Sequence, residues 1–273
     1  DSLLREEQPA EDAASGEPMS VLDHLEDLRR TVIACVLVLA VSSGTIGLFV
    51  SEFFGYLQRP LAQAMSQTSG EMQGLITTGA MSVFSVLMQV VFLGGFFLGL
   101  PFMLYFVGRF LSPALNERER KWIIPLCVAA LVLFIGGAAF SYFVLVPISL
   151  QISLHFNEMF GLNPLWEASR YYGLLVWMVM GVGVAFEFPL VVLGLVLMRI
   201  VNTEQLRRFR PYSIVLFLVI AALITPTPDP FTFLLLAGPM MLFYELSILL
   251  SVRFVRRREE TEPSGIEDFP EDL

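Results

Sequence analysis

The sequence contains few charged residues, cysteines and histidines for its length. Only 16% of its 273 residues are charged, against about 25% in a typical soluble protein, which is too few to cover a water-facing surface. Two cysteines cannot build a disulfide scaffold. Because 55% of the residues are hydrophobic and the mean hydropathy is +0.69, we expect a membrane protein with several spans.

Motifs of common enzyme classes are absent from the sequence. The chain has no Walker motif, dinucleotide-binding fingerprint, HExxH or GxSxG. Its two histidines, His24 and His155, are expected on opposite sides of the membrane and therefore cannot share a metal ion. We predict no catalytic residue, no metal site and no cofactor, and hence a protein that is not an enzyme.

The net charge of −9 comes from the two ends of the chain. Residues 1–28 contain nine acidic residues and one base, and residues 259–273 contain seven acidic residues and no base. The rest lacks the strongly basic balance of a nucleic-acid-binding protein. We predict acidic, disordered tails at 1–19 and 259–273 on either side of a membrane domain at 20–258.

Long apolar runs divide this domain into spans. Apolar stretches of about 18 residues or more are typical of membrane-crossing helices. We assign six of them, the fifth being short, which predicts an all-α fold: 31–51, 81–111, 122–146, 171–198, 211–225 and 231–254. Sizeable loops are expected at 52–80 and 147–170.

The basic residues indicate how the spans are oriented. Fourteen of them flank the span ends that lie on the same side as both termini, whereas the other side has only Arg59 and Arg170. Because basic residues accumulate in cytoplasmic loops, both termini are predicted to be cytoplasmic.

The second and fourth spans are longer than a membrane is thick. At about 1.5 Å per residue they measure on the order of 40–45 Å, against a hydrocarbon core of about 30 Å. They contain Pro101 and Pro189, and proline bends helices. Bent helices beside a short fifth span favour a concave body, although membrane helices also tolerate prolines as ordinary packing kinks.

Acidic residues gather near the predicted cytoplasmic face. Glu26 and Asp27 precede the first span, in a segment whose regularly spaced leucines predict a short amphipathic helix on the membrane surface. Glu117 and Glu119 lie among bases in the first cytoplasmic loop. Either these acids form local ion pairs, or two of them on separate elements bind guanidinium groups of an arriving arginine-containing segment. Local sequence leaves both interpretations open.

Two glutamates lie inside apolar spans. Glu187 is in the fourth span and Glu245 in the sixth, and an acid at mid-helix costs roughly 2.5–3.5 kcal/mol on insertion. We expect Glu187 to be protonated, paired or next to a wet cavity. For Glu245, closer to the cytoplasmic interface, a structural and a functional role fit the sequence equally well.

Several short motifs, taken together, point to one family. In chain order they are His24-Leu25-Glu26-Asp27-Leu28-Arg29, Phe110 with Ser112-Pro113-Ala114-Leu115, Glu119-Arg120-Lys121, Phe186-Glu187-Phe188-Pro189, Arg210-Pro211-Tyr212, Thr225-Pro226-Thr227-Pro228-Asp229-Pro230-Phe231, and Pro239 with Tyr244-Glu245. Their order across residues 20–258 resembles the TatC family, a subunit of the twin-arginine protein translocase.

The resemblance implies a fold, a function and partners. Six helices would form a glove-like body in the bacterial cytoplasmic (inner) membrane and recognise signal peptides with consecutive arginines on folded cargo. The implied partners are single-span TatB and TatA subunits, further copies of the chain in a multimeric receptor complex, and membrane lipids, with no nucleic acid. Transport would be driven by the protonmotive force.

The resemblance also assigns roles to residues. The two carboxylates that bind the arginine pair correspond to Asp27 and Glu119, Phe110 to an aromatic residue used in the same recognition, and Arg29 closes the first motif. Glu187 corresponds to a membrane-embedded glutamate. Other family positions are matched by Pro60, Tyr142, Asp229 and Glu245.

The chain departs from the family pattern at two places. Asp27 stands where a longer glutamate is common, so that either Asp27 or the preceding Glu26 can be the working acid. Phe233 stands where many members have a glutamine in a polar patch linked to partner helices.

Two other functions stay open on the residues alone. A proton-coupled small-molecule transporter would use Glu187 and Glu245 as a relay, although the chain shows no internal repeat of the kind common in transporters. A passive scaffold for other membrane proteins would depend on none of the acids individually.

Overall fold

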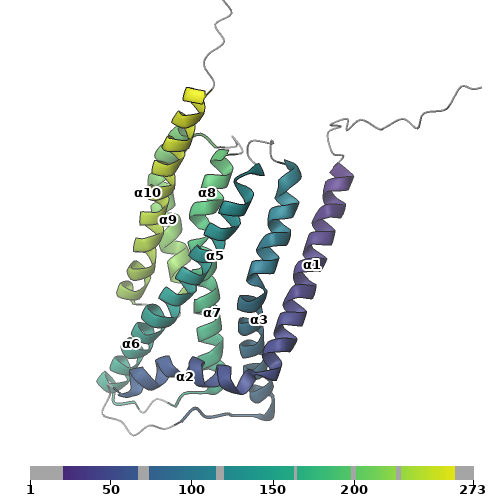
Figure 1. Ribbon diagram of the computed structural model, residues 1–273. Coiled ribbons are helices and arrows are strands. Elements are labelled where there is room, and N and C mark those ends of the chain that lie inside the picture. The colour runs from purple at the N-terminus through teal and green to yellow at the C-terminus, as the bar shows by residue number, and fades with distance from the viewer. Residues whose placement is uncertain are drawn as a thin grey trace, which may run out of the picture.

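The computed structural model describes residues 21–66, 74–114, 120–162, 165–197, 201–225 and 229–261 (Figure 1). Within these ranges the regular structure is helical apart from one parallel bridge between Ile76 and Glu167, which confirms the all-α prediction. The α-helices are α1 (Val21–Leu48), α2 (Val50–Ser66), α3 (Ala80–Leu111), α5 (Ile123–Phe140), α6 (Val146–Met159), α7 (Ala168–Phe186), α8 (Phe188–Leu197), α9 (Thr203–Ile224) and α10 (Pro230–Thr261). The predicted tail at 1–19 lies outside the described residues, and α10 extends into the one predicted from 259.

Among the described residues, five helical stretches are long and apolar enough to cross a membrane. They correspond to every predicted span except the fifth: His24–Leu48, Ala80–Leu111, Ile123–Met159, Ala168–Val196 and Pro230–Val252. The predicted fifth span lies in α9, whose first eight residues include four charged side chains, leaving a short apolar part. The count of six spans and the cytoplasmic position of both termini stay predictions.

The predicted surface helix before the first span is wrong. Residues Val21–Leu48 form one continuous helix, α1, because the sequence between the leucine-rich segment and the apolar run contains no helix breaker. The acids near its beginning therefore stand on the same rigid rod as the first span.

The two predicted loops are largely helical. Residues 50–66 form α2, which crosses the lower end of the bundle (Figure 1) and buries Leu57, Leu61 and Ala64 on one face. Residues 146–159 form α6, which continues α5 through a π-helical turn at Ser141–Leu145. Pro147 lies in the first turn of α6, where its missing N–H is tolerated.

The fourth span is broken where the sequence predicts a bend. α7 ends at Phe186 and α8 begins at Phe188, with Glu187 between them. Pro189 has no N–H and its ring crowds the carbonyl four residues earlier, which favours a break at this point. Pro101, in contrast, lies inside an uninterrupted α3.

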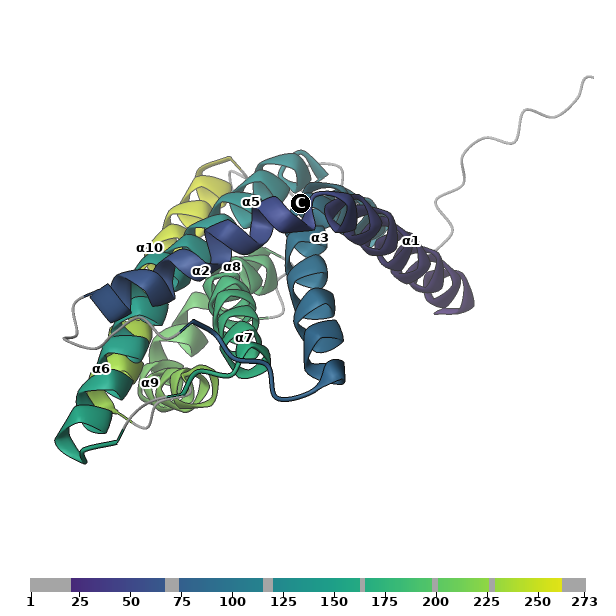
Figure 2. The same cartoon turned by 90° about the horizontal axis from the view of Figure 1, so that it is seen from below.

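The helices form an open arrangement rather than a closed ring. Viewed from below, α1 lies at one end beside α3, and α9 and α10 lie at the opposite end (Figure 2). α1 and α3 approach closely, because a Cβ atom on Gly95 would lie 2.6 Å from the Cα atom of Ser43. The predicted concave, glove-like body agrees with this arrangement.

Candidate functional site

The site begins where the first turns of α1 meet the last turn of α3. The rings of His24 and Phe110 stack with centroids 4.8 Å apart and an interplanar angle of 25°. His24 is exposed, whereas Phe110 is half-buried. This aromatic contact holds the acidic end of α1 against the end of α3, although the two residues lie far apart in the sequence.

The two acids of the first motif have different surroundings. Glu26 forms an ion pair with Arg30 at 2.7 Å, one turn further along α1. Asp27 is half-buried and pairs with no described residue. Because residues three apart share a helix face, Asp27 lies on the same side of α1 as His24. Arg29 is exposed on α1.

The second predicted carboxylate, Glu119, lies outside the described residues. Phe110 on α3 and Arg120, which directly follows Glu119, are both described. α3 ends at Leu111 and α5 starts at Ile123, so both ends of the loop that contains Glu119 lie at the end of the molecule where α1 begins (Figure 1).

Glu187 is half-buried at the break between α7 and α8. The flanking phenylalanines pack on other helices through edge-to-face ring contacts. The ring centroids of Phe186 and Phe243 lie 4.9 Å apart, and those of Phe188 and Phe217 lie 5.0 Å apart. The turn therefore holds Glu187 at a fixed point inside the membrane body.

Glu245 has a partner that the sequence did not reveal. Its carboxylate lies 2.7 Å from Nη2 of Arg210. This ion pair joins α10 to α9, and both side chains are about half exposed. The neighbouring Tyr244 hydroxyl donates to the carbonyl oxygen of Leu206 at 2.8 Å. These contacts tie the two helices together near the end where α9 starts, which favours a structural role for Glu245.

Asp229 caps a helix. Its Oδ1 atom accepts a hydrogen bond of 2.6 Å from the backbone N–H of Thr232, and Pro230 is the first residue of α10. An aspartate followed by proline at the first helical position is a favoured start. The residues before it, 226–228, lie outside the described ranges.

Pro60 and Tyr142 are both related to one backbone carbonyl of α2, that of Tyr56. The Tyr142 hydroxyl donates to the carbonyl oxygen of Tyr56, and the Tyr171 hydroxyl donates to that of Leu57 at 2.6 Å. Pro60 cannot donate to the carbonyl of Tyr56 four residues earlier. The matched positions Pro60 and Tyr142 thus belong to one arrangement that fixes α2.

A polar cluster at the opposite end of the molecule was missed by sequence reasoning. Glu167 accepts hydrogen bonds from Ser169 at 2.7 Å and Thr78 at 2.8 Å, and its carboxylate lies 3.1 Å from Nε of Arg170. The hydroxyl hydrogen bonds hold the pKa of Glu167 below its usual value, with Arg170 acting in the same direction. Ile76 pairs with this segment through two backbone hydrogen bonds of 2.9 Å.

Fold and site together define a polytopic helical membrane protein with an acidic and aromatic cluster at one end. The family described as Sec-independent protein translocase protein (TatC) matches residues 23–239. The chain belongs to the TatC family, and its function is that of a core subunit of this translocase.

Curated relatives and solved structures are similar to this chain over most of its length. The Sec-independent protein translocase protein TatC of Koribacter versatilis is 34% identical, covering 89% of this chain and 90% of its own length. The Escherichia coli K12 protein of that name is 31% identical, covering 88% and 92%. A crystal structure titled as the twin arginine translocase receptor TatC superposes with a TM-score of 0.71 at 32% identity, covering 85% of this chain and all of that one.

Proposed function

We propose that this chain is the receptor for signal peptides with consecutive arginines. Asp27 and Glu119 would each bind one guanidinium group, next to Phe110. The carrying observation is the stack of His24 on Phe110, which brings the helix face of Asp27 to the end of α3. A similar chain of known structure is titled a twin arginine translocase receptor, which supports the proposal.

The choice of Asp27 over Glu26 follows from their surroundings. Glu26 already binds Arg30 at 2.7 Å and its side chain is 59% exposed, so a guanidinium from a peptide would have to displace Arg30. Asp27 has no ion pair with a described residue, so a peptide guanidinium would displace none of them. The shorter aspartate is compensated by its position on the face that His24 holds against α3.

The proposal includes the location and the assembly. The basic residues near the ends of α1, α3 and α9 support a cytoplasmic location for these ends. Both termini would then be inside, and the protein would lie in the bacterial cytoplasmic membrane. Partners would be TatB- and TatA-type single-span subunits and further copies of this chain. Transport would depend on the protonmotive force.

The test is binding of a synthetic signal peptide to the detergent-purified chain, with an Arg-Arg and a Lys-Lys version compared. Both peptides carry the same charge, but only arginine presents a planar, bidentate donor group. We expect preference for Arg-Arg in the unmodified chain and loss of that preference in Glu119→Gln. Glu117→Gln, in the same loop, is the matched control. Equal binding of both peptides would overturn the proposal.

A further inference from the structure

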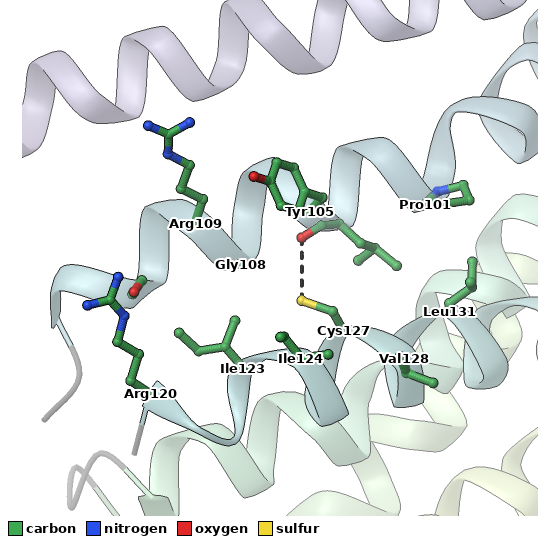
Figure 3. Close-up of a pocket in the computed structure, with 12 residues that line it drawn as sticks. Pro101, Tyr105, Gly108, Arg109, Arg120, Ile123, Ile124, Cys127, Val128 and Leu131 are labelled. Atoms are coloured by element: carbon green, nitrogen blue, oxygen red, sulfur yellow. Dashed lines mark hydrogen bonds between the residues drawn. The ribbon is translucent and has the colours of Figure 1, made fainter. Parts of the chain in front are cut away.

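A groove of about 560 Å³ lies between α3 and α5, near the end of α3 (Figure 3). This volume is within the roughly 300–1,000 Å³ typical of small-molecule sites. Its walls are mainly apolar and are formed by Pro101, Leu104, Ile123, Ile124, Val128 and Leu131, among others. Ile124 and Val128 are 76% and 56% exposed, so the groove opens to the outside of the protein.

The floor of the groove is formed by a close helix contact. A Cβ atom on Gly108 would lie 2.7 Å from the Sγ atom of Cys127, so glycine is needed for α3 and α5 to approach here. The Cys127 thiol donates to the carbonyl oxygen of Leu104 at 3.4 Å (Figure 3). The two helices are thus fixed to one another beneath the groove.

One end of the groove is basic and polar. Arg120 and Ser112 line it there, as does Arg109, whose side chain points away from α5 in Figure 3. Neither arginine is within ion-pair distance of a described carboxylate. α5 starts at Ile123 without a side-chain cap, and an uncapped helix N-terminus attracts anions.

We propose that this groove binds a phospholipid with an anionic headgroup. An acyl chain would lie along the apolar walls, and the headgroup phosphate would contact Arg120, Ser112 and the N-terminus of α5. The groove lies within two stretches that are apolar enough to span a membrane, where acyl chains are the surrounding solvent. Basic sites between membrane helices favour anionic headgroups. The groove lies at the same end of α3 as Phe110, but the lipid proposal does not rest on the binding of signal peptides.

The test is lipid binding to the full, detergent-purified chain, measured by native mass spectrometry. Dioleoyl phosphatidylglycerol and dioleoyl phosphatidylcholine have the same acyl chains, so a difference between them reports the headgroup. We expect the anionic lipid to bind more tightly, and Arg120→Gln to weaken it by about fivefold, the effect of one basic residue near anionic lipid. Arg208→Gln, an equal charge change on α9 at the same end of the molecule, should leave it unchanged.

A second pair of variants tests the apolar part. Val128→Trp fills the groove and should reduce binding of both lipids. Val132→Trp, one helical turn further along α5 and 62% exposed, lies outside the groove and should not. Equal binding of the two lipids, equal effects within either variant pair, or equally tight binding of soluble glycerol phosphate would each overturn the proposal, the last by showing that the acyl chain is not needed.

Discussion

The Tyr142 hydroxyl donates a hydrogen bond to the backbone carbonyl of Tyr56, the residue four positions before Pro60. In an α-helix that carbonyl accepts from the N–H four residues later, which proline lacks. Tyr142 therefore supplies the donor that Pro60 does not. Tyr171 secures the next carbonyl, that of Leu57. Together the two tyrosines attach α2 to the helices above it.

We expect Tyr142→Phe to lower the free energy of unfolding by about 0.5–1.5 kcal/mol, because the Tyr56 carbonyl loses its hydrogen bond. The same substitution should cost less in a Pro60→Ala background, where residue 60 regains an N–H. Denaturant unfolding of the unmodified chain, the two single variants and the double variant gives the coupling energy directly. Tyr212→Phe, at a side chain 70% exposed, is the control. An equal cost in both backgrounds would show that Pro60 and Tyr142 act independently.

Gly95 tests how α1 is held. A Cβ atom there would lie 2.6 Å from the Cα atom of Ser43. A backbone atom, unlike a side chain, cannot move out of contact by a change of rotamer. Gly95→Ala should therefore cost about 1–3 kcal/mol, as overpacking does. Gly136→Ala places the same Cβ where nothing lies within 4 Å, and should be neutral or stabilise α5 by up to about 1 kcal/mol. Unfolding free energies that do not differ would contradict the close contact of α1 with α3.

The sequence predicted the spans well because they depend on local composition. It missed α2, although Leu57, Leu61 and Ala64 have helical spacing, because Pro60 and the polar residues around it are equally typical of a loop. The π-helical turn at Ser141–Leu145 depends on packing that no local pattern records.

The site was predictable only in part. The acidic motif at Glu26 and Asp27 was visible, but the distinction between them was not, since it depends on the ion pair with Arg30 and on the long-range contact of His24 with Phe110. The Arg210–Glu245 pair likewise joins two helices whose register the sequence does not specify.

The ion pair between Arg210 and Glu245 should stabilise the packing of α9 on α10. Its carboxylate oxygen and guanidinium nitrogen lie 2.7 Å apart. Because both side chains are about half exposed, we expect Glu245→Gln to lower the free energy of unfolding by about 0.2–1 kcal/mol. Exchanging the two residues, with Arg210→Glu and Glu245→Arg combined, should recover part of this loss. If unfolding is unaffected by Glu245→Gln, the pair is not structural.

Glu167 should make stability depend on pH in the acid range. Hydrogen bonds from Ser169 and Thr78 lower its folded-state pKa, so its contribution is fully present above the unfolded pKa of about 4.5 and is lost as the pH falls through the lower folded value. Thermal unfolding below pH 5 should therefore respond less to pH in Glu167→Gln. Glu158→Gln, at an exposed position on α6, is the control. Identical pH profiles for both variants would rule out this contribution.

The most direct test of the receptor site compares Asp27→Asn with Glu26→Gln. Each substitution removes one negative charge with almost no change of shape, and the affinity of an Arg-Arg signal peptide is measured for both. Loss of a close charge partner costs at least about 2 kcal/mol, so Asp27→Asn should weaken binding about 30-fold. Glu26→Gln should change it by less than about threefold, because Glu26 is already paired with Arg30. Equal losses, or a larger loss at Glu26, would contradict the assignment.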